Sequence, residues 1–423
     1  MQMTRIASGC GCDGPMVADA LMSVDDAVNR ALDLVTPIVK GQVVALGDAL
    51  GWVSDGPVTA PRAMPLFDNA AMDGFALRAS DLEGRCCLPV AGTVAAGDPP
   101  RDLPHGTALR IFTGAPLPKG ADTVVMIEAC IDKDHKVHIA RKPAPGMNIR
   151  LAGSDQDKGA CVLHSGARIM PHHIGLLAAN GITHVTVTRR PRVAVFSTGD
   201  ELCSGPLAPG QISDANRPML LALAAQAGAE VHDLGIIPDD KEATAKALSR
   251  AAGKYDLIVS SGAVSMGGKD HIRTAVEAAG GGIKGWRVAL KPGKPVMFGK
   301  IGDTAFTGLP GNSFAVHVGF QLFVLPQLQR LSGQMNEPFA PMPAIAGFNW
   351  TRKAGRSEVF PVRRVGFDAH GTPVLQRLGR SVSATLFPLS GADGLAIVSA
   401  ETSGIQSGAP LFWRPFGTEG GQA

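Results

Sequence analysis

The 423-residue sequence has few of the features that mark several large protein classes. Aromatic residues make up only 5% of it, with a single tyrosine, and the formal net charge is only +3. A basic surface interleaved with aromatic side chains, as in nucleic-acid-binding proteins, is therefore not expected. No apolar run approaches the ~20 residues that cross a membrane, and the N-terminus has no apolar signal-peptide core. We expect a cytoplasmic protein that acts on small molecules and binds neither nucleic acid nor membrane.

Cysteine is sparse and has no regular pattern. The seven cysteines form an odd number without the spacing of a disulfide framework, which favours reduced thiols in a reducing compartment. Cys10 with Cys12, and Cys86 with Cys87, are candidates for a soft-metal site, but neither pair has a matching second half. We interpret these thiols as structural or incidental, and the sequence leaves the role of Cys10 and Cys12 open.

The order of patterns along the chain predicts a multidomain α/β plus β protein. Short alternating runs predict an inserted β-rich domain at residues 60–150, flanked by residues 16–59 and 151–189, which we expect to form one elongated N-terminal or linker domain. Strands then alternate with helices over residues 190–335, which predicts a three-layer α/β domain with a mostly parallel sheet. Residues 336–418 read as strands again and predict a small β-barrel or sandwich.

The sequence also predicts two individual helices. Ser23 precedes an apolar helical period that predicts an amphipathic helix ending near Pro37. A second period predicts one long helix over residues 313–331. Both have the simple interpretation that their apolar sides pack on a core.

Residues 255–270 combine a short buried strand, a glycine-rich loop and the start of a helix. Glycines let several peptide N–H groups converge on one oxyanion, and a following helix adds its positive N-terminal end. Asp270, at the expected start of this helix, can cap the helix or bind a metal. Taken alone, such a loop fits a structural turn as well as a ligand cradle.

Acidic residues recur after three strands of the predicted sheet, at Asp200 and Glu201, at Asp239 and Asp240, and at Asp270. Ligands bind beyond the carboxyl ends of parallel strands, so these carboxylates are expected beside one crevice, where they suit Mg²⁺. The alternative for single residues is that Asp240 caps its helix and Glu201 is solvated.

Two further segments favour an anion site. Lys291-Pro-Gly-Lys294-Pro puts two cations on a stiff turn, suited to a tetrahedral oxyanion, although a solvated charged turn is the alternative. Leu-Pro-Gly-Asn-Ser at residues 309–313 opens a helix, with Asn312 or Ser313 as cap and free N–H groups behind it, and an ordinary capped helix is the alternative. Upstream, Asp73 lies in a turn-rich segment, and a strand delivers Thr113 to a loop.

These motifs together resemble the molybdopterin molybdenumtransferase family, known as MoeA in bacteria and as the E domain of gephyrin in animals. The matching segments, in the family's order, are residues 67–75, 113–116 with 120–122, 197–202, 261–267 with Asp270, 291–295 and 309–312.

The resemblance implies that adenylylated molybdopterin and molybdate yield molybdenum cofactor and AMP in a Mg²⁺-dependent reaction. It implies a homodimer whose active cleft lies between the α/β domain of one subunit and the β-rich insert of the other, and transient contact with molybdopterin adenylyltransferase and acceptor molybdoenzymes. Two alternatives are an adenylyltransferase-like enzyme and a non-catalytic scaffold, although we expect no receptor-binding extension. The acceptor enzyme and the choice between molybdate and tungstate stay open.

Motif correspondence also implies roles for individual residues. The catalytic set is Asp73, Thr113, Asp155, Glu201 and Lys291. The Mg²⁺ set is Glu201, Asp239 and Asp270. The substrate-binding set is Ser261, Gly262, Ser265, Gly267, Arg287, Lys294, Pro310, Gly311 and Asn312. The chain departs from the family pattern at Ser313, where the family has a second proline, at Ser154, where it has Glu, and at Arg287, where it often has Lys.

Overall fold

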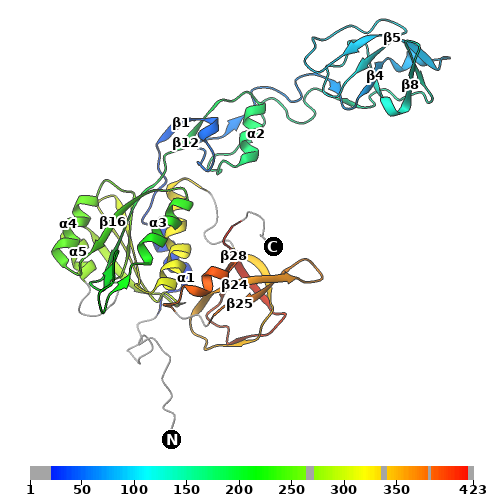
Figure 1. The fold of residues 1–423 in the computed structure, drawn as a ribbon. Coiled ribbons are helices and arrows are strands. Elements are labelled where there is room, and N and C mark those ends of the chain that lie inside the picture. Colours follow the sequence, from blue (N-terminus) through cyan, green and yellow to red (C-terminus); the bar gives the residue numbers. More distant parts are fainter. Residues whose placement is uncertain (1–20, 263–270, 335–340, 380–382, 418–423) are drawn as a thin grey trace. The chain divides into compact units, whose positions relative to one another are not determined.

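A computed structural model describes residues 21–262, 271–334, 341–379 and 383–417. The chain divides into two compact units (Figure 1). The first, here called the core unit, comprises Met1–Gln42 and Thr188–Ala423, and the second, the inserted unit, comprises Val43–Val187. The four domain boundaries predicted from the sequence stay predictions.

The core unit is built on a six-stranded sheet in the order β16-β13-β17-β21-β20-β18. The parallel strands are β13 (Arg192–Thr198), β16 (Glu230–Ile237), β17 (Leu257–Ser261) and β21 (Thr304–Leu309). β18 (Gly282–Arg287) and β20 (Pro295–Ile301) complete one side as antiparallel strands. This confirms the prediction of an α/β domain with a mostly parallel sheet.

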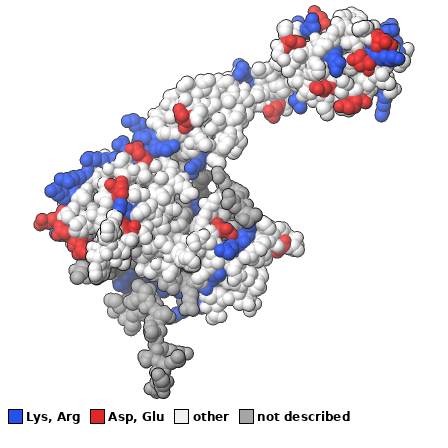
Figure 2. All heavy atoms as spheres, in the orientation of Figure 1, with Lys and Arg blue, Asp and Glu red and all other residues white. Residues whose placement is uncertain are grey.

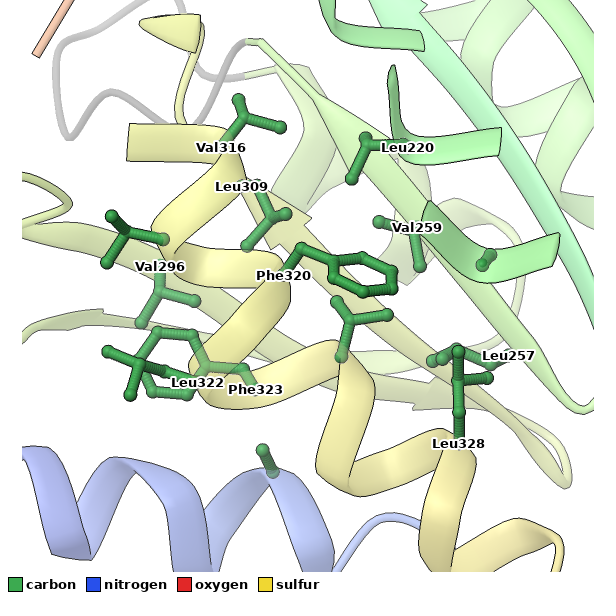
Figure 3. Close-up of a cluster of buried hydrophobic side chains, with 14 of the residues drawn as sticks. Leu220, Leu257, Val259, Val296, Leu309, Val316, Phe320, Leu322, Phe323 and Leu328 are labelled. Carbon is green, nitrogen blue, oxygen red and sulfur yellow. The ribbon is translucent and has the colours of Figure 1, made fainter. Parts of the chain in front are cut away.

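Helices cover both faces of this sheet because its central strands are apolar on both sides. Val195 and Val259 contribute to one buried cluster, whereas Phe196 and Ile258 contribute to the other, as the alternation of strand side chains requires. Figure 3 shows part of the first cluster, in which Phe320 lies between the sheet and the helices. The helices on that side are α1 (Val24–Leu32), α3 (Asn216–Gln226), α6 (Ser313–Gly319) and α7 (Leu325–Leu331). The opposite cluster is covered by α4 (Lys241–Ala251) and α5 (His271–Ala278).

The predicted long helical run over residues 313–331 is confirmed in its bounds, but it is not α-helical throughout. A π-helical segment, Phe320–Val324, separates α6 from α7. Pro326 lies in the first turn of α7, where it has no N–H to donate to the preceding turn and its ring crowds that turn's carbonyl. The wider π-turn accommodates this interruption without ending the helical run. Helix α1 has the predicted Ser23 cap, whose Oγ accepts the N–H of Asp26 at 3.0 Å, but it ends at Leu32, before Pro37.

A buried amide joins the N-terminal helix to the sheet. Gln327, which is 0% exposed, accepts a hydrogen bond from Thr307 Oγ1 at 2.9 Å and donates one to the carbonyl of Ala31 at 2.9 Å. Thr307 belongs to strand β21 of the sheet, and Ala31 belongs to helix α1. The side chain of Gln327 therefore joins α7 to both elements. Buried polar groups satisfied in this way specify a single packing arrangement.

The C-terminal strands of the core unit form a closed barrel, which decides between the barrel and the sandwich. Its strands are β22 (Met342–Ala346), β24 (Ser357–Phe367), β25 (Pro373–Arg377), β26 (Gly394–Val398) and β28 (Pro410–Pro415). They pair in the order β24-β25-β22-β28-β26, and β26 pairs back to β24. The short strand β19 (Leu290–Lys291) of the α/β domain adds to the barrel through β24.

The inserted unit contains strands, as the sequence predicts. Its main sheet has six strands in the order β7-β4-β6-β5-β9-β8. These are β4 (Gly74–Leu77), β5 (Cys87–Val94), β6 (Ala108–Ile111), β7 (Thr123–Met126), β8 (Cys130–Lys133) and β9 (Lys136–Ile139). The outgoing and returning chain segments pair twice, as β2 (Val58–Thr59) with β11 (Cys161–Leu163) and as β3 (Asn69–Ala70) with β10 (Ile149–Arg150).

A buried hydrophobic cluster of the inserted unit packs around α2 (Pro171–Ala179). It lies near the pairing of β1 (Gly41–Ala45) with β12 (His184–Thr188). On the visible face of this unit, positive and negative side chains are interspersed (Figure 2). Within the described ranges, no helix has the length and hydropathy needed to cross a membrane.

A buried histidine should make the stability of the core unit depend on pH. Burial in α6 lowers the pKa of His317 from 6.5 to about 4. Protonation therefore favours the unfolded chain, so stability present above pH 6.5 is lost as the pH falls towards 4. We expect up to about 3 kcal/mol of this loss to disappear in His317→Gln. Urea unfolding of both proteins at pH 7, 5.5 and 4.5 measures it, and identical pH slopes would contradict the prediction.

Candidate active site

The register of the parallel strands brings the predicted site segments to one edge of the sheet. Ser197 in β13 pairs with Ser261 in β17, and Ser261 pairs with Leu309 in β21. The next residue of β13, Thr198, pairs with Ile237 at the end of β16. The loops after all four strands therefore leave the sheet at the same level, where ligands of open α/β sheets bind.

The antiparallel strands add the basic residues to this edge. Arg287 ends β18 opposite Pro295, the first residue of β20, and Met297 pairs with Gly308 near the end of β21. The turn with Lys291 and Lys294, which precedes β20, therefore lies at the same edge. The structure thus gathers the described basic and glycine-turn residues that the sequence assigned to one site.

The loops after β17 and β21 contact each other directly. The N–H of Gly262 donates to Leu309 O at 3.2 Å. Gly262 has φ +97°, and a Cβ there would lie 2.3 Å from Thr198 O, so this position requires glycine. Pro310 and Gly311 follow Leu309 on the facing loop. Ser265, Gly267 and Asp270, predicted for the same cradle, lie outside the described residues.

Asn216, at the start of α3, joins these two loops and was not singled out by the sequence. Its Nδ2 donates to Ser261 Oγ at 2.8 Å and to Gly311 O at 2.7 Å. Asn216 is 8% exposed, so both bonds are sheltered from water. No local sequence signal identifies this role, because the two partners lie 45 and 95 residues further along the chain.

A charged network supports the start of α3. Ser197 Oγ donates to Asp214 Oδ1 at 3.1 Å, and Asp214 Oδ2 accepts from Arg217 Nε at 2.9 Å. Arg217 also pairs with Asp233 in β16. The network holds the helix carrying Asn216 against β13 and β16. Sequence reasoning missed it because its members come from four separate segments: β13, the loop before α3, α3 and β16.

The acidic residues after β13 and β16 lie close together. Asp200 Oδ1 accepts the N–H of Asp239 at 3.1 Å, and Asp239 Oδ1 lies 3.8 Å from His271 Nε2. Glu201 folds back over Gly199, where an added Cβ would lie 2.7 Å from Glu201 Oε2. Asp240 caps α4 by accepting the N–H of Ala243 at 2.7 Å, so for Asp240 the capping interpretation is confirmed.

This donor set fits Mg²⁺ in its chemistry. Mg²⁺ takes one or two carboxylates, keeps several waters and completes its shell with substrate phosphate oxygens. Glu201 and Asp239 are exposed, and their carboxylates are hard oxygen donors. Within the described residues no three His, Cys, Asp or Glu side chains form a ready metal cage, and Asp270, the third predicted ligand, lies outside them.

The sequence predicts free N–H groups at the start of α6, and this prediction is wrong for two of them. The N–H groups of Phe314 and Ala315 donate to Ser383 O at 3.0 and 3.3 Å. Asn312 occupies the N-cap position, but its side chain makes no capping bond and instead donates through Nδ2 to Ser383 Oγ at 3.0 Å. A loop of the barrel therefore fills the helix terminus, which is a long-range contact that the local motif does not predict.

In the inserted unit, Asp73 and Thr113 lie together as the motifs suggest. Asp73 Oδ1 accepts both the N–H and the Oγ1–H of Thr113, each at 2.7 Å. The backbone and hydroxyl hydrogen bonds from Thr113 lower the pKa of Asp73, helped by the charge of Arg110. Asp155 is exposed on the returning chain, where its N–H donates to Met64 O at 3.0 Å.

Comparison with known proteins extends over nearly the whole chain. The family description "MoeA N-terminal region (domain I and II)" matches residues 22–181, "Probable molybdopterin binding domain" matches 194–330, and "MoeA C-terminal region (domain IV)" matches 343–416. A Haemophilus influenzae protein named molybdopterin molybdenumtransferase is 34% identical over 401 residues, covering 94% of this chain and 99% of that protein. The chain belongs to the molybdopterin molybdenumtransferase (MoeA) family.

Other members of the molybdopterin molybdenumtransferase family agree in sequence and fold. A Mycobacterium tuberculosis protein named molybdopterin molybdenumtransferase 2 is 37% identical over 382 residues, covering 87% of this chain and 93% of the relative. The crystal structure of a MoeA protein from Pyrococcus horikoshii matches with a TM-score of 0.80 and 26% identity, covering 94% of this chain and all of that one. The family assignment thus rests on every part of the fold.

Replacing Asn216 by Ala should destabilise the core unit. The substitution leaves the carbonyl of Gly311 without this donor and removes a bond to Ser261, so we expect a loss of about 1–3 kcal/mol in the free energy of unfolding. Asn29→Ala, an exposed position on α1, is the control and should stay within about 0.5 kcal/mol of wild type. Urea unfolding measures both, and equal stability of the two variants would contradict the joining role.

Proposed function

We propose that this protein is a molybdopterin molybdenumtransferase that inserts molybdate into adenylylated molybdopterin and releases molybdenum cofactor and AMP. The main support is the position of three kinds of residue from separate parts of the chain. Basic residues, glycine turns and acidic residues all lie at the edge of one mostly parallel sheet where its parallel strands end. Relatives bearing this name match the inserted unit and the barrel as well as the α/β domain, which favours this function over adenylylation by the α/β domain alone.

The basic turn suits the metal-containing substrate. Molybdate is a tetrahedral oxyanion, and lysine ammonium groups bind such anions as point charges. We assign its binding to Lys291 and Lys294, with Arg287 nearby at the end of β18. The dithiolene sulfurs belong to the pterin substrate, so the reaction needs no protein thiolate cluster.

The glycine turns and carboxylates suit the nucleotide part. Peptide N–H groups near Gly262 and Gly311, with the Ser261 hydroxyl, favour the binding of phosphate oxygens. Glu201 and Asp239, together with Asp270, would hold Mg²⁺, which offsets phosphate charge when a phosphoanhydride is cleaved. Asp73 contributes an exposed carboxylate whose pKa is lowered by its bonds to Thr113, and Asp155 is a further acidic candidate.

We further propose a cytoplasmic enzyme. The five cysteines within the described ranges, at positions 86, 87, 130, 161 and 203, all carry free thiols. Free thiols fit a reducing compartment.

The proposed homodimer is supported by exposed apolar side chains around Asp73. Hydrogen bonds join the three segments that carry them: Gly114 N donates to Ala70 O at 2.9 Å, and Ala71 N donates to Asn148 O at 2.8 Å. The apolar side chains, here called the Asp73 ring, are Leu66, Phe67, Met72, Phe112, Met147 and Leu151. Several exposed apolar side chains on segments that are hydrogen-bonded to one another favour cover by another protein surface, here a second copy of the chain.

Light scattering during size-exclusion chromatography should give twice the chain mass of 43.8 kDa. Phe112→Glu puts a charge into the Asp73 ring and should raise the dimer dissociation constant by about tenfold or more. Ile131→Glu is the control, because Ile131 is 67% exposed on the same unit but outside the ring. A monomeric wild-type protein, or equal weakening by both substitutions, would overturn the dimer proposal.

Asp73→Asn tests the enzymatic role directly. The amide oxygen can still accept both bonds from Thr113, so the fold should persist while the negative charge is lost. We expect molybdate-dependent AMP release from adenylylated molybdopterin, with Mg²⁺ present, to fall by roughly 10²-fold or more. Asp98→Asn, at an exposed turn carboxylate of the same unit, should retain full activity. Wild-type turnover by Asp73→Asn removes Asp73 from the mechanism, and no AMP release by the wild-type protein overturns the proposed function.

A further inference from the structure

We propose that Glu358, in the C-terminal barrel, is a positioning residue that orients Lys291 for oxyanion binding. The inference rests on the proposed function, because it gives the barrel a part in the same reaction. Glu358 was not among the residues that the sequence motifs suggested, and among the described residues of the proposed site it pairs with Lys291.

The backbone brings these two residues together. β19 pairs in parallel with β24, and the register places Lys291 opposite Glu358. The N–H of Ser357 also donates to Ala289 O at 2.7 Å. The lysine turn is therefore hydrogen-bonded to the barrel, so Lys291 and Glu358 stay adjacent whether or not a ligand is bound.

The carboxylate of Glu358 is buried and forms ion pairs with two cations, and the charge of a third, Arg377, also acts on it. Glu358 is 1% exposed, its Oε2 lies 3.1 Å from Arg352 Nε, and its Oε1 lies 3.3 Å from Lys291 Nζ. Within the part of the chain that the structure describes, no donor reaches Oε1 with hydrogen-bond geometry. A buried carboxylate oxygen without a hydrogen bond is costly, so it attracts the one ammonium group beside it.

Arg352 is fixed, whereas Lys291 is the adjustable member. The Arg352 side chain is 3% exposed and donates to Ser399 O at 3.1 Å and to the carbonyls of Thr402 and Arg356. The Lys291 side chain is 43% exposed. Arg352 therefore anchors Glu358, and Glu358 in turn restrains the lysine. The three groups together carry one net positive charge, which Lys291 presents towards solvent.

Restraining Lys291 before a ligand arrives favours binding, because less side-chain freedom is lost on binding. The charge of Glu358 acts in the opposite direction. Without it the three groups carry two net positive charges, which by itself would strengthen anion binding. The sign of the change on removing the carboxylate therefore distinguishes an orienting role from a charge effect.

Glu358→Gln removes the charge while retaining the shape of the side chain. We expect kcat/KM for molybdate to fall by about tenfold, the factor typical of losing one charge-assisted contact. Asp393→Asn is the matched control. Asp393 directly precedes the first residue of β26, whereas Glu358 pairs with Val398 at the other end of that strand. A fall in KM for molybdate with unchanged kcat, or equal effects of both substitutions, would overturn the proposal.

A Lys291→Met background separates orientation from general damage to the barrel. If Glu358 acts through Lys291, adding Glu358→Gln to Lys291→Met leaves kcat/KM for molybdate unchanged. If Glu358 is merely structural, the same addition lowers kcat/KM by the factor seen in the wild-type background, and the proposal fails. Thermal unfolding of all four proteins reports the accompanying loss of stability.

An NMR measurement that does not depend on turnover tests the positioning role separately from the proposed function. Reductive ¹³C-methylation labels Lys291, and its signal is assigned by its absence in Lys291→Met. We expect a broader, more restrained signal in the wild-type protein and a narrow, mobile one in Glu358→Gln. Equal line widths would overturn the positioning role even if AMP release is normal, whereas absent AMP release with the expected widths overturns only the proposed function.

Discussion

The hydrogen-bonded ladder of the parallel strands determines where the loops of the candidate site can lie. Ser197, Ser261 and Leu309 share one level of this ladder, so the loops that follow them begin side by side. A shift of one residue in any of these strands would turn every side chain of that strand to the other face and move its loop. The buried clusters on both faces oppose such a shift, because each strand is apolar on both sides. The packing that buries both faces of the sheet therefore also fixes the positions of these loops.

Local patterns were sufficient to predict the layers, the position of most strands and the identity of the loops. Glycine turns, helix caps and apolar alternation act over a few residues, so Ser23 and Asp240 as caps follow from the sequence. The parts that could not be predicted involve long-range partners. Asn216 meets Gly311 across 95 residues, and Asn312 meets Ser383 across 71. A single sequence carries no record of which distant side chains meet.

Asp73 and Glu358 are held by different forces. Asp73 accepts hydrogen bonds from neutral groups of Thr113 and stays open to solvent, whereas Glu358 is enclosed between charged partners. Salt screens charges in contact with water much more than buried pairs. The inserted unit thus presents a carboxylate suited to contact a ligand, and the barrel keeps one whose influence passes through a lysine.

The closed barrel is joined to the α/β domain in a way that limits its exchange between proteins. Its strand β24 accepts β19 as an extra strand, and Ser383 from the same barrel occupies the start of α6. Closure leaves the barrel strands without free edges except where the α/β domain has taken one. A chimera that swapped the last 80 or so residues between relatives would therefore also change the contacts that hold β19 and the start of α6.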